Sequence, residues 1–147
     1  MISQKAKYAL RALIALAAAP PGESLAIGDI ASAQNIPKKF LEQILLDLKR
    51  HGILASRRGK EGGYLLLKSS SEVTFGEVLR LVDGPIAPLP CLSQNFYRRC
   101  ADCQDEASCE IRKVFSGVAI ASRKVLDGTT LADAVGNGVS PKASSLE

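Results

Sequence analysis

Residues 37–68, "PKKFLEQILLDLKRHGILASRRGKEGGYLLLK", combine a helical pattern with a hairpin pattern. The first half predicts an amphipathic helix over residues 37–51, because its apolar side chains recur at helical spacing. These side chains are Phe40, Leu41, Ile44, Leu45 and Leu48. The second half predicts two strands, "ILASR" and "YLLLK", joined by a turn containing Gly59, Gly62 and Gly63.

The other face of the predicted helix is polar and mostly basic. Between residues 36 and 60 there are seven Lys or Arg residues against two Asp or Glu. Residues 1–68 carry eleven basic and five acidic side chains, a net charge of +6, whereas residues 69–147 carry eight and ten, a net charge of −2. This concentration favours a polyanionic partner. A basic surface that is merely solvated would give the same charge count.

The flanking segments complete a winged helix-turn-helix. Residues 3–19 predict a helix that ends at "PPGE", and residues 27–33 predict a short helix just before the 37–51 helix. Thr74 and Glu77 predict a capping box at the start of a further helix. We expect a mainly α-helical fold with a small β-hairpin wing, in which the 37–51 helix enters the DNA major groove.

The candidate DNA contacts lie on the 37–51 helix and at the hairpin tip. Lys38 and Lys39 suit phosphates or guanine edges, Gln43 suits adenine, and Glu42 can accept a hydrogen bond from cytosine N4. The tip adds basic side chains beside a glycine that lets the backbone approach phosphate. The tip residues are Arg57, Arg58, Gly59 and Lys60.

The N-terminal segment also has features of a secretory signal peptide. It places early positive charge before "ALIALAAA" and small residues. Arg11 interrupts the apolar run, and residues 2–17 form one apolar helical face, so we prefer an amphipathic helix. No apolar run reaches the roughly 20 residues of a membrane span. We therefore expect a cytoplasmic protein without a membrane partner.

All four cysteines lie between residues 91 and 109, in the pattern C-x8-C-x2-C-x5-C. Thiolates around a C-x2-C pair can hold a four-iron or a two-iron cluster, or zinc. Without metal, the thiols could act as a redox switch, since Arg98 and Arg99 beside Cys100 could lower its pKa, although nearby carboxylates oppose this effect. The irregular x8 and x5 spacings favour an iron–sulfur cluster, because structural zinc more often uses two short-spaced cysteine pairs and only one is present. The expected ligands are Cys91, Cys100, Cys103 and Cys109.

A long helix is predicted after the last cysteine. Its apolar seam calls for a partner, and a symmetric homodimer is the economical answer. The seam comprises Ile111, Val114, Val118, Ala121 and Val125, flanked by Phe115 and Leu126. We expect a DNA-binding domain (1–84), a cysteine-rich sensor loop (85–109), a dimerisation helix with a short terminal helix (110–135) and a flexible tail (136–147). The sequence contains no recognisable pair of nucleophile and base, so we do not expect an enzyme.

The run "FLEQILLDLKRHGILASRRGKEGGYLLLKSSSEVTFGEVLRLVDGP" and the opening "ISQKAKYALRALIALA" resemble the IscR/NsrR-type (Rrf-two) family of bacterial winged-helix transcription regulators. The resemblance covers roughly residues 1–130. It implies a homodimer on a pseudo-palindromic operator, with the long helix crossing between subunits. It also implies a cluster that senses iron, nitric oxide or redox state, and DNA contacts at Lys39, Glu42, Gln43, Arg58 and Gly59.

The cysteine segment departs from that family pattern. Well-known cluster-binding members use three cysteines and a fourth ligand of another type, whereas this segment has four cysteines. Lys7 stands where some members carry a ligand carboxylate, and no histidine follows the third cysteine. The single histidine, His51, is expected to cap the 37–51 helix or contact backbone rather than bind metal.

Overall fold

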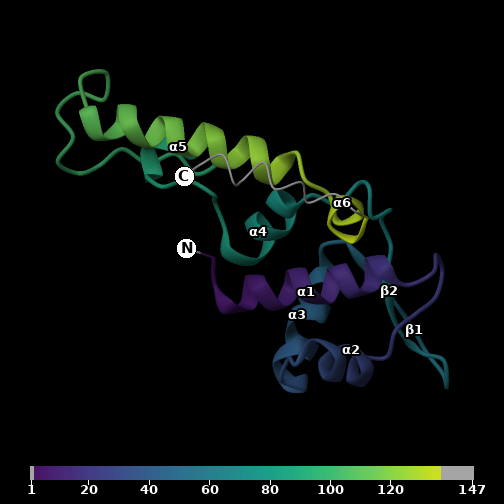
Figure 1. The fold of residues 1–147 in the computed structure, drawn as a ribbon. Helices are drawn as coiled ribbons and strands as arrows, with labels where there is room; N and C mark the ends of the chain where they lie inside the picture. Colours follow the sequence, from purple (N-terminus) through teal and green to yellow (C-terminus); the bar gives the residue numbers. More distant parts are fainter. Residues whose placement is uncertain (1, 137–147) are drawn as a thin grey trace.

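The protein is described by a computed structural model covering residues 2–136. Apart from Gly136, the tail expected at residues 136–147 lies outside the described residues. The chain runs through helices, a hairpin and then further helices (Figure 1). In order, the elements are α1 (Gln4–Ala18), α2 (Ile27–Gln34), α3 (Lys38–Arg50), β1 (Leu54–Arg57), β2 (Gly63–Leu66), α4 (Phe75–Asp83), the 3-10 turn η1 (Pro90–Leu92), α5 (Glu110–Asp127) and α6 (Leu131–Val135).

Helix α1 is the centre of the core and contacts α2, α3, α4, α6 and β2. Ser3 is the N-cap of α1, and its hydroxyl accepts a hydrogen bond from the Ala6 backbone N–H at 3.0 Å. One face of α1 is buried, as the amphipathic pattern predicted. Its buried residues are Ala6, Ala9, Leu10, Ala12, Leu13 and Leu16. Among residues 2–136, no helix is long and apolar enough to cross a membrane.

Helices α2 and α3 form the helix-turn-helix. Asn35 ends α2 in the left-handed conformation (φ 53°), and the Ile36 backbone N–H donates to the Ala31 carbonyl at 2.9 Å. This arrangement reverses the chain in a tight turn and buries Ile36. The apolar face of α3 is buried as predicted, except that Phe40 is 36% exposed and packs edge-on against Tyr8 of α1.

The wing is an antiparallel hairpin with Leu54 opposite Leu66 and Arg57 opposite Gly63. The residues before α2 extend it, because Leu25 and Tyr64 exchange two backbone hydrogen bonds of 2.8 Å. Gly63 is required at this join, since a Cβ there would overlap the Leu25 carbonyl. The hairpin is therefore anchored to the helix-turn-helix.

Helix α4 begins at the predicted cap, with the Thr74 hydroxyl accepting from the Glu77 backbone N–H at 3.1 Å. The predicted capping box is only half formed. The Glu77 carboxylate instead accepts from Lys68 at 2.8 Å, because this cation is available next to β2.

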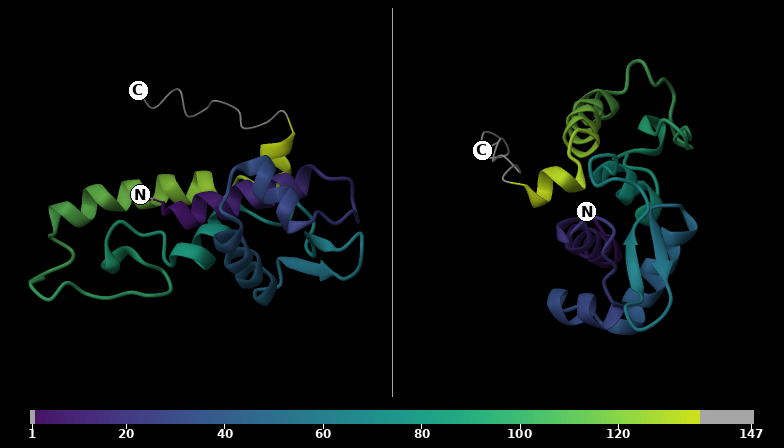
Figure 2. Two further views of the ribbon diagram at one scale, coloured as in Figure 1. Left: turned by 90° about the horizontal axis from the view of Figure 1, so that it is seen from below. Right: turned by 90° about the vertical axis from the view of Figure 1, so that its right-hand side faces the viewer.

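Helix α5 begins outside the core and runs back toward it, and α6 follows at the end that reaches the core (Figures 1 and 2). Phe75 N–H donates to the Thr129 carbonyl and Leu131 N–H to the Val73 carbonyl, each at 2.9 Å. Leu131 is fully buried in the core cluster. The sequence groups α6 with the long helix, but the structure packs it against α1 and so closes the helix-turn-helix core.

Candidate nucleic-acid interface and thiol site

The outward face of α3 carries the four predicted DNA-contact residues of this helix. Lys38 and Lys39 occupy its first turn, and Glu42 and Gln43 follow one turn later; all four side chains are exposed. The opposite face is anchored by Leu41, Ile44, Leu45 and Leu48, which are buried. A rigidly seated helix therefore presents cationic and amide groups to solvent, as major-groove recognition requires.

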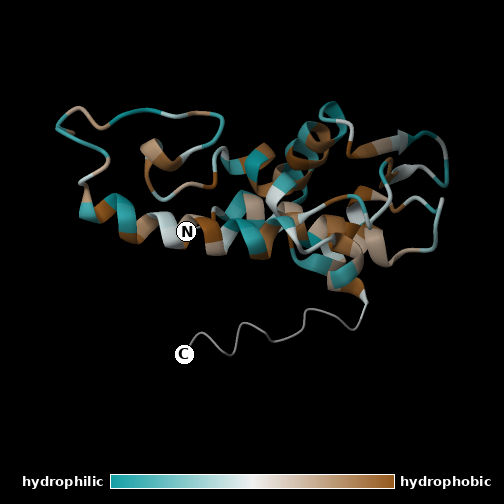
Figure 3. Ribbon diagram, turned by 90° about the horizontal axis from the view of Figure 1, so that it is seen from above, coloured by the Kyte–Doolittle hydropathy of each residue, from teal (hydrophilic) through white to brown (hydrophobic). Residues whose placement is uncertain are grey.

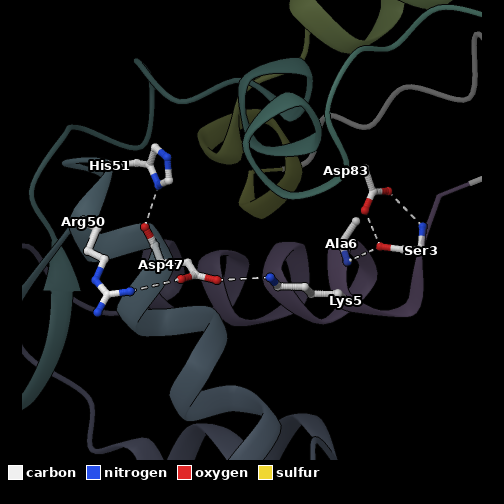
Figure 4. A network of polar contacts seen from close by, with 7 residues as sticks. All are labelled: Ser3, Lys5, Ala6, Asp47, Arg50, His51 and Asp83. Carbon is white, nitrogen blue, oxygen red and sulfur yellow. Dashed lines mark hydrogen bonds and ion pairs between the residues drawn. The ribbon is translucent and has the colours of Figure 1, made fainter.

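The C-terminal half of α3 is held by polar contacts (Figure 4). Asp47 accepts from Lys5 of α1 at 3.1 Å and lies 3.8 Å from Arg50. His51 follows α3 as its C-cap, and its Nδ1 lies 2.8 Å from the Asp47 carbonyl oxygen. The expectation that His51 caps the helix or contacts backbone is confirmed.

The wing tip presents the predicted basic side chains. Arg57, Arg58, Gly59 and Lys60 are all exposed. Arg57 donates to the Gly22 carbonyl at 3.2 Å, so part of its guanidinium braces the loop before α2. Among the ion pairs found in residues 2–136, none involves Arg58 or Lys60. These two cations remain available for phosphate.

The wing and α3 are linked directly. Lys49, in the last turn of α3, donates to the Ser56 hydroxyl of β1 at 2.6 Å. The Gly62 backbone N–H donates to the Gly59 carbonyl at 2.9 Å and closes the tip. Helix α3 and the wing therefore form one connected surface, on which the basic groups of both elements are exposed.

The cysteine segment joins the end of α4 to the start of α5. It leaves α4 at Gly84, whose φ of 84° favours glycine, and passes through η1, where Cys91 is buried. Cys100 and Cys103 bound a turn closed by a 3.1 Å backbone hydrogen bond between them. Cys109 is the N-cap of α5. The outer part of the loop lies beyond the first turn of α5 (Figure 1).

Arg112 connects the two ends of this segment. Its guanidinium donates to the Cys91 carbonyl at 3.5 Å, and its backbone N–H donates to the Cys109 sulfur at 3.4 Å. Its Nε is buried and has no hydrogen-bond partner within residues 2–136. A buried N–H on a residue that contacts both Cys91 and Cys109 is a suitable donor to thiolate or sulfide. Sequence reasoning missed this residue, although its position three residues after Cys109 was visible.

Of the two opposing influences expected at Cys100, the one that raises its pKa prevails over the neighbouring arginines. Loss of hydration raises its pKa, and the negative charges of Cys91, Asp102, Cys103 and Cys109 add to the rise. Arg99 does not offset this because its guanidinium donates to the Cys103 and Gln104 carbonyls, at 3.2 and 2.9 Å. The adjacent arginine braces the backbone of the turn.

The donor chemistry fits a soft metal or an iron–sulfur cluster, since four thiols lie in one segment and the unpartnered N–H of Arg112 follows it in α5. The geometry does not define a finished site. Within residues 2–136, no three His, Cys, Asp or Glu side chains lie together in a group that could hold a metal ion.

Helix α5 carries an exposed apolar seam. Brown and teal alternate along its length in Figure 3. Ala119 is its one buried residue in the described structure, where it faces the rest of the chain. The predicted seam residues are exposed, and Ile120 adds an apolar side chain that the pattern did not include. The large exposed apolar residues of α5 are Ile111, Val114, Phe115, Val118, Ile120 and Val125.

Comparison with known proteins identifies the class of this architecture. Residues 2–137 match the Rrf2 family, described as iron-dependent transcriptional regulators. An rrf2-like HTH-type transcriptional regulator of Rhodobacter capsulatus is 50% identical over 150 residues, covering 100% of this chain and 99% of its own. The HTH-type transcriptional regulator IscR of Serratia proteamaculans is 29% identical over 136 residues, covering 92% of this chain and 79% of its own.

A solved structure agrees with these sequence matches. CymR, the global cysteine regulator of B. subtilis, superposes with a TM-score of 0.77 and 30% identity, covering 92% of this chain and 95% of that chain. The predicted winged helix-turn-helix fold is therefore confirmed. The chain belongs to the Rrf2 family of DNA-binding transcriptional regulators, not to a family of enzymes.

Proposed function

We propose that this regulator is a homodimer whose operator binding is controlled by an iron–sulfur cluster on Cys91, Cys100, Cys103 and Cys109. The observation that carries the proposal is the position of these thiols. All four lie in the segment that leads from α4, a helix of the DNA-binding domain, into α5. A change at the thiols therefore acts on the segment that connects the DNA-binding domain to the start of α5.

The DNA partner is a double-stranded, pseudo-palindromic operator. Lys38 and Lys39 bind phosphates or guanine edges, Gln43 pairs with adenine, and Glu42 accepts from cytosine N4. On the wing, the basic tip binds flanking phosphates, and Gly59 allows the backbone to approach them. The exposure of these side chains supports this assignment.

The dimer forms through α5. A row of large apolar side chains on one helix is costly to leave in water, and a second copy covers it symmetrically. Residues 1–84 with α6 then form the DNA-binding domain, residues 85–109 the sensor loop, and α5 the dimerisation helix. Two recognition helices held by one dimer must match the separation of two half-sites.

The cysteines transmit the signal by fixing α5. When bound, an iron–sulfur cluster joins four thiolates into one unit and responds to iron supply, nitric oxide or redox state. Cys91 and Cys109 stand at the two ends of the segment, and Arg112 already contacts both. Holding these ends firmly fixes the start of α5 relative to η1. Coupling of about 1–3 kcal/mol changes DNA affinity roughly 5–150-fold.

The family description as iron-dependent and the similarity to IscR support the cluster. The raised pKa of Cys100 disfavours a reactive thiolate in the metal-free chain. The alternatives are structural zinc and a cluster-free thiol switch. The similarity to CymR, a cysteine regulator, supports testing the thiol switch.

Anaerobic purification with absorption spectroscopy and iron, sulfide and zinc analysis tests the proposal. A brown protein with equal iron and sulfide, and DNA affinity that changes when the cluster is removed, is the expected result. Cys103→Ala should abolish this response and leave a folded dimer. One zinc per chain, or a metal-free protein that fails reconstitution with iron and sulfide, would refute the cluster. A normal response in Cys103→Ala would also refute it.

A further inference from the structure

Helices α4 and α5 are joined by a two-bonded ion pair. Arg80 Nη1 lies 2.6 Å from Asp127 Oδ1, and Arg80 Nη2 lies 2.9 Å from Asp127 Oδ2. Two parallel bonds fix the orientation of both side chains as well as their distance. The hydrogen bonds raise the pKa of Arg80 and lower the pKa of Asp127, so both groups stay charged at neutral pH. Arg123 further lowers the pKa of Asp127.

Gly76 makes room for this pair. It lies one helical turn before Arg80 on α4, and a Cβ built on it would overlap the Asp127 carboxylate and lie 3.0 Å from Arg80 Nη1. Its backbone is ordinary helix, so glycine is needed for space rather than for conformation. The contact of α4 with the end of α5 thus depends on three residues that are separate in sequence.

The pair adds a side-chain attachment to the backbone attachments between these segments. Phe75 N–H donates to the Thr129 carbonyl, Leu131 N–H donates to the Val73 carbonyl, and Thr74 bridges Thr130. The backbone attachments at the start of α4 alone would let α5 rotate about that point. The Arg80–Asp127 pair lies further along α4 and therefore also fixes the direction of α5 relative to α4. Asp127 is the last residue of α5, so its bond sets the direction in which the helix leaves the domain.

A small rotation at this end is amplified along α5. The helix has 18 residues. At 1.5 Å per residue it is roughly 27 Å long, so a tilt of about 10° moves its far end by about 5 Å. One base pair of DNA advances by about 3.4 Å. A modest change in tilt therefore shifts a recognition helix by more than one base pair.

We infer that Arg80 and Asp127, with Gly76, are positioning residues that determine which half-site separation the dimer accepts. They contact no DNA themselves; they fix the angle between the helix-turn-helix and α5. The inference rests on the α5 homodimer and the palindromic operator proposed above. It does not depend on whether the cysteines hold a cluster.

Another ion pair on the same helix supplies a matched control. Glu77, the neighbour of Gly76, pairs with Lys68 at 2.8 Å, with side-chain exposures of 33% and 40%. The Arg80 and Asp127 side chains are 33% and 43% exposed. The Lys68–Glu77 pair joins α4 to the segment after β2 instead of α5. Glu77→Gln therefore removes a comparable charge from α4 without touching α5.

The test is selection of binding sites from a random-sequence duplex library, followed by sequencing and measurement of the separation between paired half-sites. Wild type and Glu77→Gln should each recover one dominant separation. Asp127→Asn and Gly76→Ala should both broaden the distribution, so that preference over neighbouring separations falls by about fivefold or more. The base sequence of each half-site should stay the same, because α3 is unchanged.

Two outcomes would overturn the inference, and they are distinguishable. If wild type recovers paired half-sites and Asp127→Asn keeps the same narrow separation, the positioning role is refuted while the dimer stands. If wild type recovers only single half-sites and sediments as a monomer, the proposed dimer is refuted and this inference with it.

Discussion

The Lys5 ammonium group on α1 lies 3.1 Å from the Asp47 carboxylate on α3. Two residues before Lys5, Ser3 donates through its backbone N–H to Asp83, the last residue of α4, at 2.9 Å; the Ser3 hydroxyl also donates to Asp83 (Figure 4). The first turn of α1 thus contacts the recognition helix on one side and the helix preceding the cysteine segment on the other.

The Lys5–Asp47 pair should be weak but measurable. Both side chains are about one third exposed, 36% and 34%, so solvent screens their attraction. A double-mutant cycle with Lys5→Ala and Asp47→Ala, measured by urea unfolding, should give a coupling free energy of about 0.5 kcal/mol. A coupling energy of zero, or one above about 2 kcal/mol, would contradict this reading. The Lys68–Glu77 pair should give a similar value and serves as reference.

Arg58→Ala should weaken DNA binding and make it less sensitive to salt. Arg58 is exposed at the wing tip and has no ion-pair partner within residues 2–136. Losing one phosphate contact should reduce the slope of log affinity against log salt by about 1. Fluorescence anisotropy at several salt concentrations measures both quantities. Lys113→Ala removes one exposed positive charge from α5 and should leave the slope unchanged.

Leu131→Ala should destabilise the DNA-binding domain itself. Leu131 is completely buried in the core shared with α1 and α4, so its loss leaves a cavity. The free energy of unfolding should fall by about 2–5 kcal/mol in chemical denaturation. Val135→Ala on the same short helix, where the side chain is 41% exposed, should cost less than about 1 kcal/mol. Equal effects of the two changes would show that α6 does not close the core.

Acid should remove the stabilisation by Arg80 and Asp127. Arg80 lowers the pKa of Asp127 below its ordinary value of 3.8, so the unfolded state takes up the proton first as pH falls. The pair therefore stabilises the fold fully above this value and loses its contribution as pH falls through the lower folded pKa. The difference in unfolding free energy between wild type and Asp127→Asn should be constant near neutral pH and shrink below about pH 3.8. If the difference in unfolding free energy between wild type and Asp127→Asn grew in acid, the pair would not lower the pKa of Asp127 in the folded state.

The elements of this fold could be predicted because their signals are local. Apolar spacing defines α3, glycines mark the wing, and Thr74 caps its helix as the sequence indicates. These patterns depend on neighbours a few residues away, so one sequence is sufficient to recognise them.

Long-range contacts were not predictable in the same way. Leu131 gives no sign that it enters the first domain, and Gly76 gives no sign that Asp127 fills the space beside it. The direction of the pKa shift of Cys100 could not be decided from sequence, because arginines and carboxylates both lie nearby and only the structure shows that Arg99 donates to backbone carbonyls. Such relationships depend on packing between segments that are far apart in the chain.

The burial of Leu131 also bears on how the protein is synthesised. A ribosome releases the recognition helix and the wing long before it releases α6, and domains fold as their last elements emerge. We infer that the nascent chain cannot complete its DNA-binding core until α5 has also been made. A prematurely terminated product therefore lacks a finished DNA-binding domain and cannot compete for operators with the full-length regulator.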